Sequence, residues 1–169
     1  QQRLLRYLQG GRIHPAILLT GSESRAKFEV AKAMAKFLLC TGKLHGPFCN
    51  VCSICRRIEK QVHPDVLIIQ EAEEGVLKIE TIRGITHQMT ILPLEGRRKI
   101  CIVDECHRMN AAASNAFLKT LEEPGEGRYF FLLTTQAGAL IPTILSRTVQ
   151  FAFKPETEIS VLESGETSR

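Results

Sequence analysis

The sequence predicts an α/β fold, in which a five-stranded parallel sheet is flanked by helices on both faces. Five short apolar runs, at residues 16–20, 66–69, 100–103, 129–133 and 149–153, each have the length of a strand buried on both faces. Helical patterns separate these runs, and strands that alternate with helices form parallel sheets through right-handed crossovers. Ligands of such sheets bind at the carboxyl ends of the strands, where we therefore expect the functional residues.

Two of the intervening helices can be delimited from their apolar spacing. The first spans 24–39 and has apolar or small residues at Ala26, Val30, Ala33, Met34 and Phe37. The second spans 110–123 and has such residues at Ala113, Ala116, Phe117 and Leu121. Asn110 is a favourable N-cap for this second helix, and Pro124 ends it.

The length and composition indicate one main domain. With 169 residues, of which 44% are hydrophobic, the chain can bury one sizeable core, which we expect over 1–153. Residues 154–169 have too few apolar side chains for a core, so we expect a polar linker or the start of a further domain there. A net charge of +4 is too small to indicate a nucleic-acid partner.

The hydropathy pattern favours a cytoplasmic protein. No apolar stretch approaches the roughly 20 residues that span a membrane. The first residues also lack the long apolar segment of a secretory signal. We therefore expect a cytoplasmic location and no membrane partner.

Four of the six cysteines lie close together, and their spacing predicts a metal site. Cys40, Cys49, Cys52 and Cys55 form the pattern C-x8-C-x2-C-x2-C, in which two-residue spacers let pairs of thiolates bind one ion. Four thiolates complete a tetrahedral structural Zn²⁺ site, so we expect a zinc module inserted at about 40–60. A disulfide scaffold would distribute its cysteines across the fold, and the clustering therefore favours a reducing compartment.

Three alternatives to this zinc site are an iron–sulfur cluster, free core cysteines and a histidine ligand, and free core cysteines are unusual at this density. A [4Fe–4S] cluster also uses two-residue spacers, but its familiar run continues with x3-C-P, which is absent here. His45 or His63 could replace one cysteine as a ligand, although a lone loop histidine is more often solvated. A zinc ribbon that binds nucleic acid would need basic and aromatic residues around the cysteines, and the nearby ones are Lys43, Phe48, Arg56 and Arg57.

A degenerate phosphate-binding loop follows the first predicted strand. The residues from Gly21 to Lys27 have the spacing of G-x-x-x-x-G-K-[ST]. Ala26 stands where a glycine would let backbone amides approach the phosphates, and Phe28 stands where a hydroxyl would bind Mg²⁺. Glu23 adds a negative charge beside the phosphate position. We therefore expect no bound ATP or Mg²⁺. Taken alone, the motif favours a plain strand–turn–helix junction with a surface lysine, and the other motifs of the chain change that interpretation.

The predicted strand at 100–103 ends in an acidic pair, Asp104 and Glu105. In a working ATPase the first acid holds Mg²⁺ through water, and the second polarises the attacking water. Acidic residues also commonly follow a strand where it enters a turn. The pair therefore indicates a nucleotide site only in combination with the phosphate loop. Because Phe28 offers no hydroxyl, we interpret the two acids as structural remnants.

Together these residues resemble the N-terminal domain of the delta-prime subunits of the bacterial DNA polymerase III clamp loader, which belong to the AAA+ family of P-loop proteins. The resemblance covers nearly the whole chain. Besides the cysteine insertion, it rests on RIHPA at 12–16, HPD at 63–65, NAFLKTLEEP at 115–124 and PTILSR at 142–147. The lid and collar domains that follow in that family are absent from the sequence, so we expect the chain to be part of a longer protein.

The resemblance implies roles for two further residues. In that family a Ser-Arg-Cys motif places an arginine at the subunit boundary, where it reaches the ATP of the neighbouring subunit. Here the motif reads Ser146-Arg147-Thr148, so the arginine is retained, and we expect it at the edge of the domain, exposed and away from Lys27. By itself Arg147 would be an ordinary cation before an edge strand. Thr135 matches the family's phosphate-sensing position.

The resemblance therefore implies a subunit that hydrolyses no ATP, supplies Arg147 in trans and supports loading of the sliding clamp in DNA replication. Such a subunit is not an enzyme on its own but is part of a DNA polymerase holoenzyme. Its partners would be the gamma/tau motor and delta subunits, and it would meet the sliding clamp and primed DNA only in the assembled complex. The alternatives are a gamma/tau-like motor that hydrolyses ATP, against which Ala26 and Phe28 argue, and the zinc-ribbon module.

Overall fold

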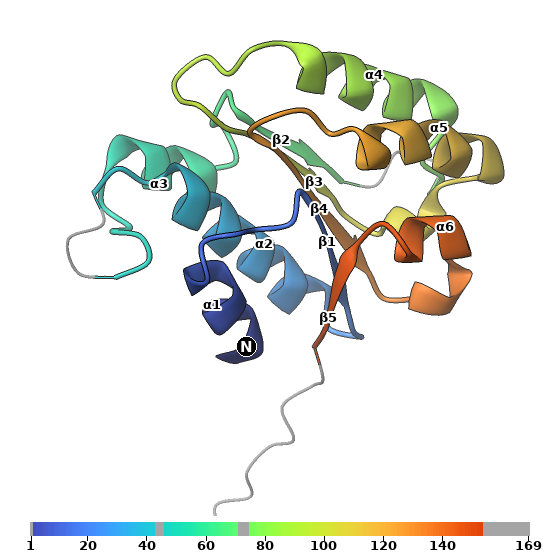
Figure 1. Cartoon of the computed structure of the whole chain (residues 1–169), viewed down its shortest axis with the longest axis horizontal. Coiled ribbons are helices and arrows are strands. Elements are labelled where there is room, and N and C mark those ends of the chain that lie inside the picture. Colours follow the sequence, from blue (N-terminus) through green and yellow to red (C-terminus); the bar gives the residue numbers. More distant parts are fainter. Residues whose placement is uncertain (1, 43–45, 71–74, 154–169) are drawn as a thin grey trace, which may run out of the picture.

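The five apolar runs form one parallel sheet, as the sequence predicts. The computed structural model describes residues 2–42, 46–70 and 75–153. Its strands are β1 (Ala16–Thr20), β2 (Val66–Ile69), β3 (Lys99–Val103), β4 (Arg128–Thr134) and β5 (Val149–Ala152). They pair in the order β2-β3-β4-β1-β5, and every pairing among the described strands is parallel (Figure 1).

The helices include the two that the sequence delimits and others that it does not. They are α1 (Gln2–Gln9), α2 (Ser24–Leu39), α3 (Ser53–Glu59), α4 (Ile79–Thr90), α5 (Ala111–Glu122) and α6 (Pro142–Leu145). Asn110 caps α5, because its side chain accepts a hydrogen bond from Ala113 N at 2.8 Å. The helix α4 buries Ile82, Ile85 and Met89, a spacing that would have predicted it.

The helices cover both faces of the sheet and make a three-layer fold (Figure 1). Successive residues of β1 point to opposite faces, so Ile17 and Leu19 join one core cluster and Ala16 and Leu18 join the other. The first cluster includes buried residues of α1, α2 and α3, and the second includes those of α4, α5 and α6. Each face of the sheet therefore has its own apolar core.

This topology brings the ends of β1, β3 and β4 to one edge of the sheet. The register pairs Thr20 with Thr134 and Val103 with Leu132, so the segments that follow these strands lie side by side. The strand β5 lies at the margin of the sheet, beside β1. No described helix is long and apolar enough to cross a membrane, and the linker expected at 154–169 lies outside the described residues.

Candidate functional site

The loop that joins β1 to α2 begins at Gly21, a position that only glycine can occupy. Its φ of 141° is a conformation that L side chains rarely adopt. A Cβ there would lie 2.1 Å from the carbonyl oxygen of Phe153. Phe153 is held in place because its amide donates to Thr20 O at 2.7 Å. The chain that leaves β5 therefore packs directly against the start of the phosphate loop.

Lys27 turns back onto its own loop. Its Nζ donates to Gly21 O at 2.5 Å, and the residue is completely buried. Burial lowers the pKa of Lys27, although the nearby carboxylates of Glu105 and Asp104 oppose that effect. The ammonium is thus held by the backbone of its own loop, and the lysine is not a surface residue.

The two substituted positions of the loop have different environments. Ala26 is exposed, whereas Phe28 is only 8% exposed and packs in the core cluster between the sheet and α2. A phenyl ring supplies no oxygen to a cation. Its place in the core also means that a hydroxyl residue at position 28 would leave a cavity.

Glu105 links the three segments that meet at this edge. Its Oε1 accepts a hydrogen bond from Ser24 Oγ at 2.7 Å, and its Oε2 accepts one from Thr135 Oγ1 at 2.9 Å. His107 Nδ1 lies 3.1 Å from the same Oε2. Burial by itself would raise the pKa of Glu105, but the hydrogen bonds from Ser24 and Thr135 outweigh it and leave that pKa lowered. Both carboxylate oxygens are therefore engaged within the chain.

Asp104, the other acid, is half-buried beside Lys27 and Glu105. Burial raises the pKa of Asp104, and the amide of Glu105 donates to its Oδ1 at 3.0 Å. The structure thus brings the phosphate loop, the acidic pair and Thr135 to one edge. The sequence analysis did not single out Ser24 or His107, because neither residue occupies a position that the motif specifies.

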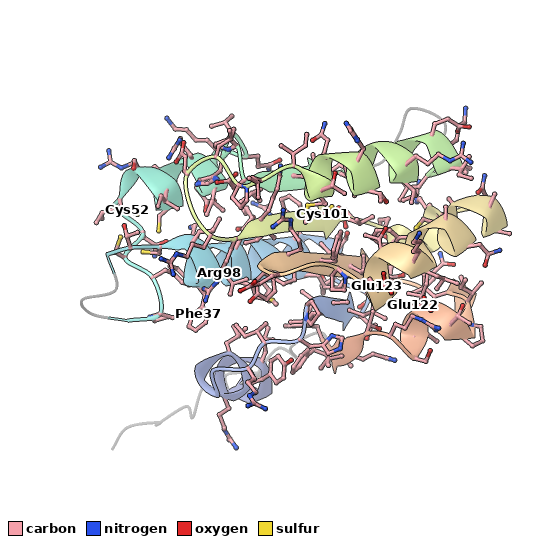
Figure 2. All side chains as sticks on the ribbon, turned by 45° about the horizontal axis from the view of Figure 1, so that its top comes forward. Phe37, Cys52, Arg98, Cys101, Glu122 and Glu123 are labelled. Carbon is pink, nitrogen blue, oxygen red and sulfur yellow. The ribbon has the colours of Figure 1, made fainter. Side chains whose placement is uncertain are left out.

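The four cysteines form a cluster that could hold a metal ion. Their Sγ atoms all lie within 4.8 Å of one another, and those of Cys40 and Cys49 are 3.6 Å apart. Four sulfurs at about 2.3 Å from a common ion are roughly 3.8 Å apart in a tetrahedron. The arrangement therefore has the dimensions of a four-thiolate site. Figure 2 places Cys52 at the end of the molecule far from Glu122.

Backbone amides also point at these sulfurs. Cys49 N donates to Cys40 Sγ, Cys52 N to Cys49 Sγ, and Cys55 N to Cys52 Sγ, at 3.3–3.4 Å. Hydrogen bonds from the amides of Cys52 and Val51 lower the pKa of Cys49 to about 6, whereas burial raises that of Cys55 to about 12. A bound dication would favour the thiolate form of all four.

The histidine alternatives receive no support from the described residues. His63 is buried, and its Nδ1 accepts a hydrogen bond from Asp65 N at 3.1 Å. It is not part of the cluster of ligand atoms found among the described residues. His45 lies outside the described residues.

Arg147 lies between α6 and β5, and its guanidinium contacts its own chain. Its Nε donates to Glu122 Oε1 at 2.7 Å, Nη2 pairs with the same carboxylate, and Nη1 donates to Thr143 O at 3.0 Å. The side chain keeps 32% of its surface exposed. The guanidinium is therefore paired within the chain and still partly accessible.

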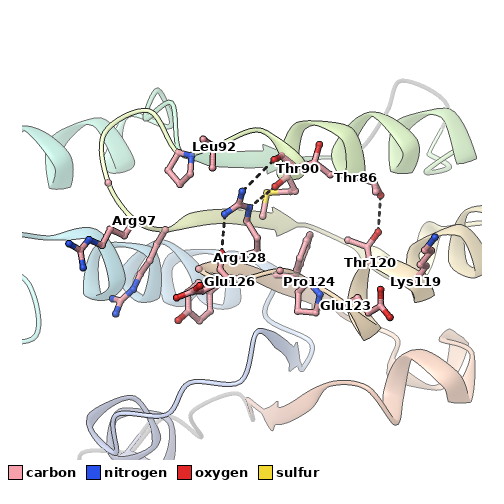
Figure 3. Close-up of a pocket in the computed structure, with 18 of the residues that line it drawn as sticks. Thr86, Thr90, Leu92, Arg97, Lys119, Thr120, Glu123, Pro124, Glu126 and Arg128 are labelled. Carbon is pink, nitrogen blue, oxygen red and sulfur yellow. Dashed lines mark hydrogen bonds between the residues drawn. The ribbon is translucent and has the colours of Figure 1, made fainter.

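A groove of about 1160 Å³ lies at the other end of the sheet, beside the carboxyl ends of α4 and α5 (Figure 3). It is lined in part by residues that precede β3 and β4, so it lies at the amino ends of the strands. Arg128 lines the groove and binds the last carbonyl groups of α4. Its Nε donates to Met89 O at 2.6 Å and its Nη2 donates to Thr90 O at 3.4 Å. None of the site residues that the sequence predicts lines this groove.

Curated relatives of the chain are subunits of a bacterial DNA polymerase. The subunit tau of DNA polymerase III from Escherichia coli (strain K12) is 39% identical over 144 residues, which are 85% of this chain and 22% of that protein. The subunit delta' of DNA polymerase III from Bacillus subtilis (strain 168) is 31% identical over 148 residues, which are 88% of this chain and 44% of that protein. The chain thus spans less than half the length of these relatives.

A solved structure and a family comparison lead to the same family as these relatives. A DNA polymerase III gamma subunit-related protein from Thermotoga maritima has a TM-score of 0.64 and 28% identity, over 90% of this chain and 45% of that one. The fold is accordingly the P-loop AAA+ type that the resemblance implied. Residues 1–157 match the family described as DNA polymerase III, delta subunit, and the chain belongs to this family.

Proposed function

We propose that this chain is part of a non-hydrolysing subunit of a DNA polymerase III clamp loader, of the delta-prime kind. The observation that carries the proposal is Phe28: the residue after the phosphate-loop lysine is a buried phenyl ring where a hydroxyl would bind Mg²⁺. Without that ligand the loop cannot support phosphoryl transfer. The subunit then contributes to clamp loading through its contacts with other subunits.

The environment of the neighbouring residues supports the same proposal. Glu105, which would polarise the attacking water in an ATPase, accepts hydrogen bonds from Ser24 and Thr135 on both of its oxygens. Lys27 is buried, and its ammonium donates to Gly21 O. The residues of a nucleotide site are thus present but serve to join the loop, β3 and β4.

A motor subunit is the second candidate, because the relatives named tau and gamma are as similar as, or more similar than, the one named delta'. Identity over the common domain does not distinguish the two, since both kinds of subunit share this fold. The discriminating feature is the nucleotide site itself. Ala26 and Phe28 favour the subunit that does not hydrolyse ATP.

For the cysteine cluster we propose a structural Zn²⁺. All four ligands are sulfur, which suits zinc, and four thiolates leave no open position for catalysis. The ion would hold the segment around 40–60 against α2. Metal analysis of the purified chain tests this proposal, and iron, or the absence of metal, would contradict it.

The absence of nucleotide chemistry is tested by titrating the purified chain with a fluorescent ATP analogue and Mg²⁺, beside a Mg²⁺-dependent phosphate-release assay. We expect neither saturable binding nor turnover. A tau subunit measured in parallel provides the positive control. Turnover that depends on Mg²⁺ would overturn the proposal and favour the motor. Restoring Thr at position 28 is a poor test, because emptying a buried phenyl site costs about 3–5 kcal/mol.

We further propose that Arg147 acts on ATP held by a neighbouring subunit. An arginine supplied in trans contributes roughly 10³–10⁵ in rate in other phosphoryl-transfer systems. Arg147→Ala should therefore slow ATP hydrolysis by the reconstituted loader, and Arg147→Lys should restore little of it, because an ammonium lacks the planar fork of a guanidinium.

Glu122→Gln is the matched control, since it weakens the ion pair but keeps the guanidinium. If Arg147 acts on the neighbour's nucleotide, Glu122→Gln should retain turnover. If the arginine matters only as the partner of Glu122, both variants should lose turnover alike. Unchanged turnover with Arg147→Ala would remove the trans role altogether.

A further inference from the structure

The loop that connects α4 to β3, residues 91–96, exposes apolar side chains. Leu92 is 76% exposed and Leu94 is 75% exposed, so burial of these leucines does not hold the loop in place. Its backbone is instead fixed by a buried carboxylate. Leu94 N donates to Asp65 Oδ1 at 2.7 Å, and Glu95 N donates to Asp65 Oδ2 at 2.9 Å. These two amides report directly on whether the loop is closed.

A second contact attaches the same loop to α3. Arg57 Nη1 donates to Glu95 Oε1 at 2.5 Å, and Nη2 pairs with Oε2 of the same residue. The pair is therefore bidentate, which is the stronger geometry for an arginine and a carboxylate. Each side chain is about one-third exposed, so solvent weakens the pair without abolishing it.

The first turn of the helix that carries Arg57 is attached to the cysteine cluster. At seven residues, α3 is too short to be stable in isolation. Its N-cap is Cys52, whose Sγ accepts a hydrogen bond from Cys55 N at 3.4 Å. Arg57 Nε donates to Ser53 O at 3.4 Å, so the guanidinium rests on the first turn of the helix. That turn follows the N-cap Cys52 and contains Cys55, so two of the four cysteines belong to the start of the helix.

We propose that the cysteine module, when it holds its ion, braces the 91–96 loop through α3 and the Arg57–Glu95 pair. This inference rests on the proposed metal site. The module would then affect the main domain as well. Leu92 and Gly96 line the groove beside α4 and α5, so the bound ion stabilises one wall of that groove without touching it. Loss of the ion releases the first turn of α3, and the amides of Leu94 and Glu95 are then held by Asp65 without the support of the Arg57–Glu95 pair.

Hydrogen exchange at the amides of Leu94 and Glu95 tests the brace. The chain is compared with Zn²⁺ bound and after removal of the ion by a chelator, for the natural sequence and for Arg57→Ala. In the natural sequence, removal of Zn²⁺ should speed exchange about two- to fivefold, the range of an exposed ion pair. Arg57→Ala with Zn²⁺ bound should already show that faster exchange, and chelation should add little.

Two further variants make the comparison specific. Glu95→Gln should reproduce Arg57→Ala from the loop side. Lys60→Ala removes an exposed positive charge from the end of the same helix and should leave exchange unchanged. A zinc-bound chain whose loop exchanges equally fast with and without the ion, or in which chelation acts as strongly in Arg57→Ala, overturns the brace alone. A chain that binds no metal overturns the metal site and the brace with it.

Discussion

Glu105 shows how a single side chain can connect segments that are far apart in the sequence. Its backbone adopts a left-handed conformation, with φ of 45°, which is uncommon for a residue with a side chain. In this backbone conformation the carboxylate of Glu105 accepts hydrogen bonds from Ser24 and Thr135. The carboxylate therefore connects the loop that follows β1 with the residue that follows β4.

Glu105→Gln should lower the stability of the chain in a pH-dependent way. The pKa of Glu105 in the folded chain lies below its ordinary value of 4.5, so its contribution is present above that pH and is lost as the pH falls through the folded pKa. At about pH 7 we expect the variant to lose about 1–2 kcal/mol of unfolding free energy, because the hydrogen bonds are made to a charged, mostly buried acceptor.

Urea unfolding at about pH 7 and about pH 3 measures this difference, which should shrink at the lower pH. Glu23→Gln is the control, since Glu23 is an exposed carboxylate in the loop between β1 and α2. An equal loss at both values of pH would show that the carboxylate charge of Glu105 contributes nothing.

At the scale of an element, α5 shows how local sequence can define a helix. Asn110 supplies the cap, and residues such as Ala113 and Phe117 supply the buried face. Phe117 also meets Phe130 of β4 edge-on, with ring centroids 5.6 Å apart. The cap and the apolar face therefore specify the same helix, and both are visible in the sequence.

Asn110→Ala should destabilise the chain by about 1 kcal/mol, because the amide of Ala113 loses its acceptor. Asn115→Ala is the matched control, since Asn115 is exposed on the same helix. It should be neutral or slightly stabilising, because alanine has the higher helix propensity. Thermal unfolding followed by circular dichroism compares the two, and equal midpoints would show that the cap contributes nothing.

At the scale of the whole molecule, the sheet and the cysteine module have different sources of stability. The sheet is buried between two apolar clusters, with residues such as Phe131 and Leu133 fully enclosed. The module adds few buried apolar residues, chiefly Ile58, and an ion-pair network in which Glu59 accepts from Lys32 at 2.8 Å and from Lys36 at 2.7 Å. The sheet should therefore fold without the metal.

Removal of the metal should loosen the module and leave the sheet folded. In urea, the chelated chain should retain a cooperative transition with a nearly unchanged slope, because most of the buried surface is still lost in one step. Phe131→Ala provides the contrast, since it should cost about 3–5 kcal/mol in the core. A chelated chain without a cooperative transition would show that the ion is required for the whole fold.

Much of the fold could be predicted from the sequence, because the signals are local. Short apolar runs predicted all five described strands to within one or two residues, and α2 has the predicted bounds. The helices α1, α3, α4 and α6 were not delimited. Three of them have eight residues or fewer, whereas the apolar spacing of α4 was present in the sequence and was missed. The cysteine spacing predicted that the four sulfurs lie together, because the four cysteines are close in the sequence.

The sequence by itself determined the parallel sheet, the substituted phosphate loop and the cysteine cluster, since each depends on periodicity or on spacing within a few tens of residues. Only the tertiary structure decided what the side chains contact. Ser24 meets Glu105 across 81 positions, and Arg147 meets Glu122 across 25. Such partners depend on strand order and on the packing of the crossover helices, which bring distant segments together. No local sequence pattern identifies them.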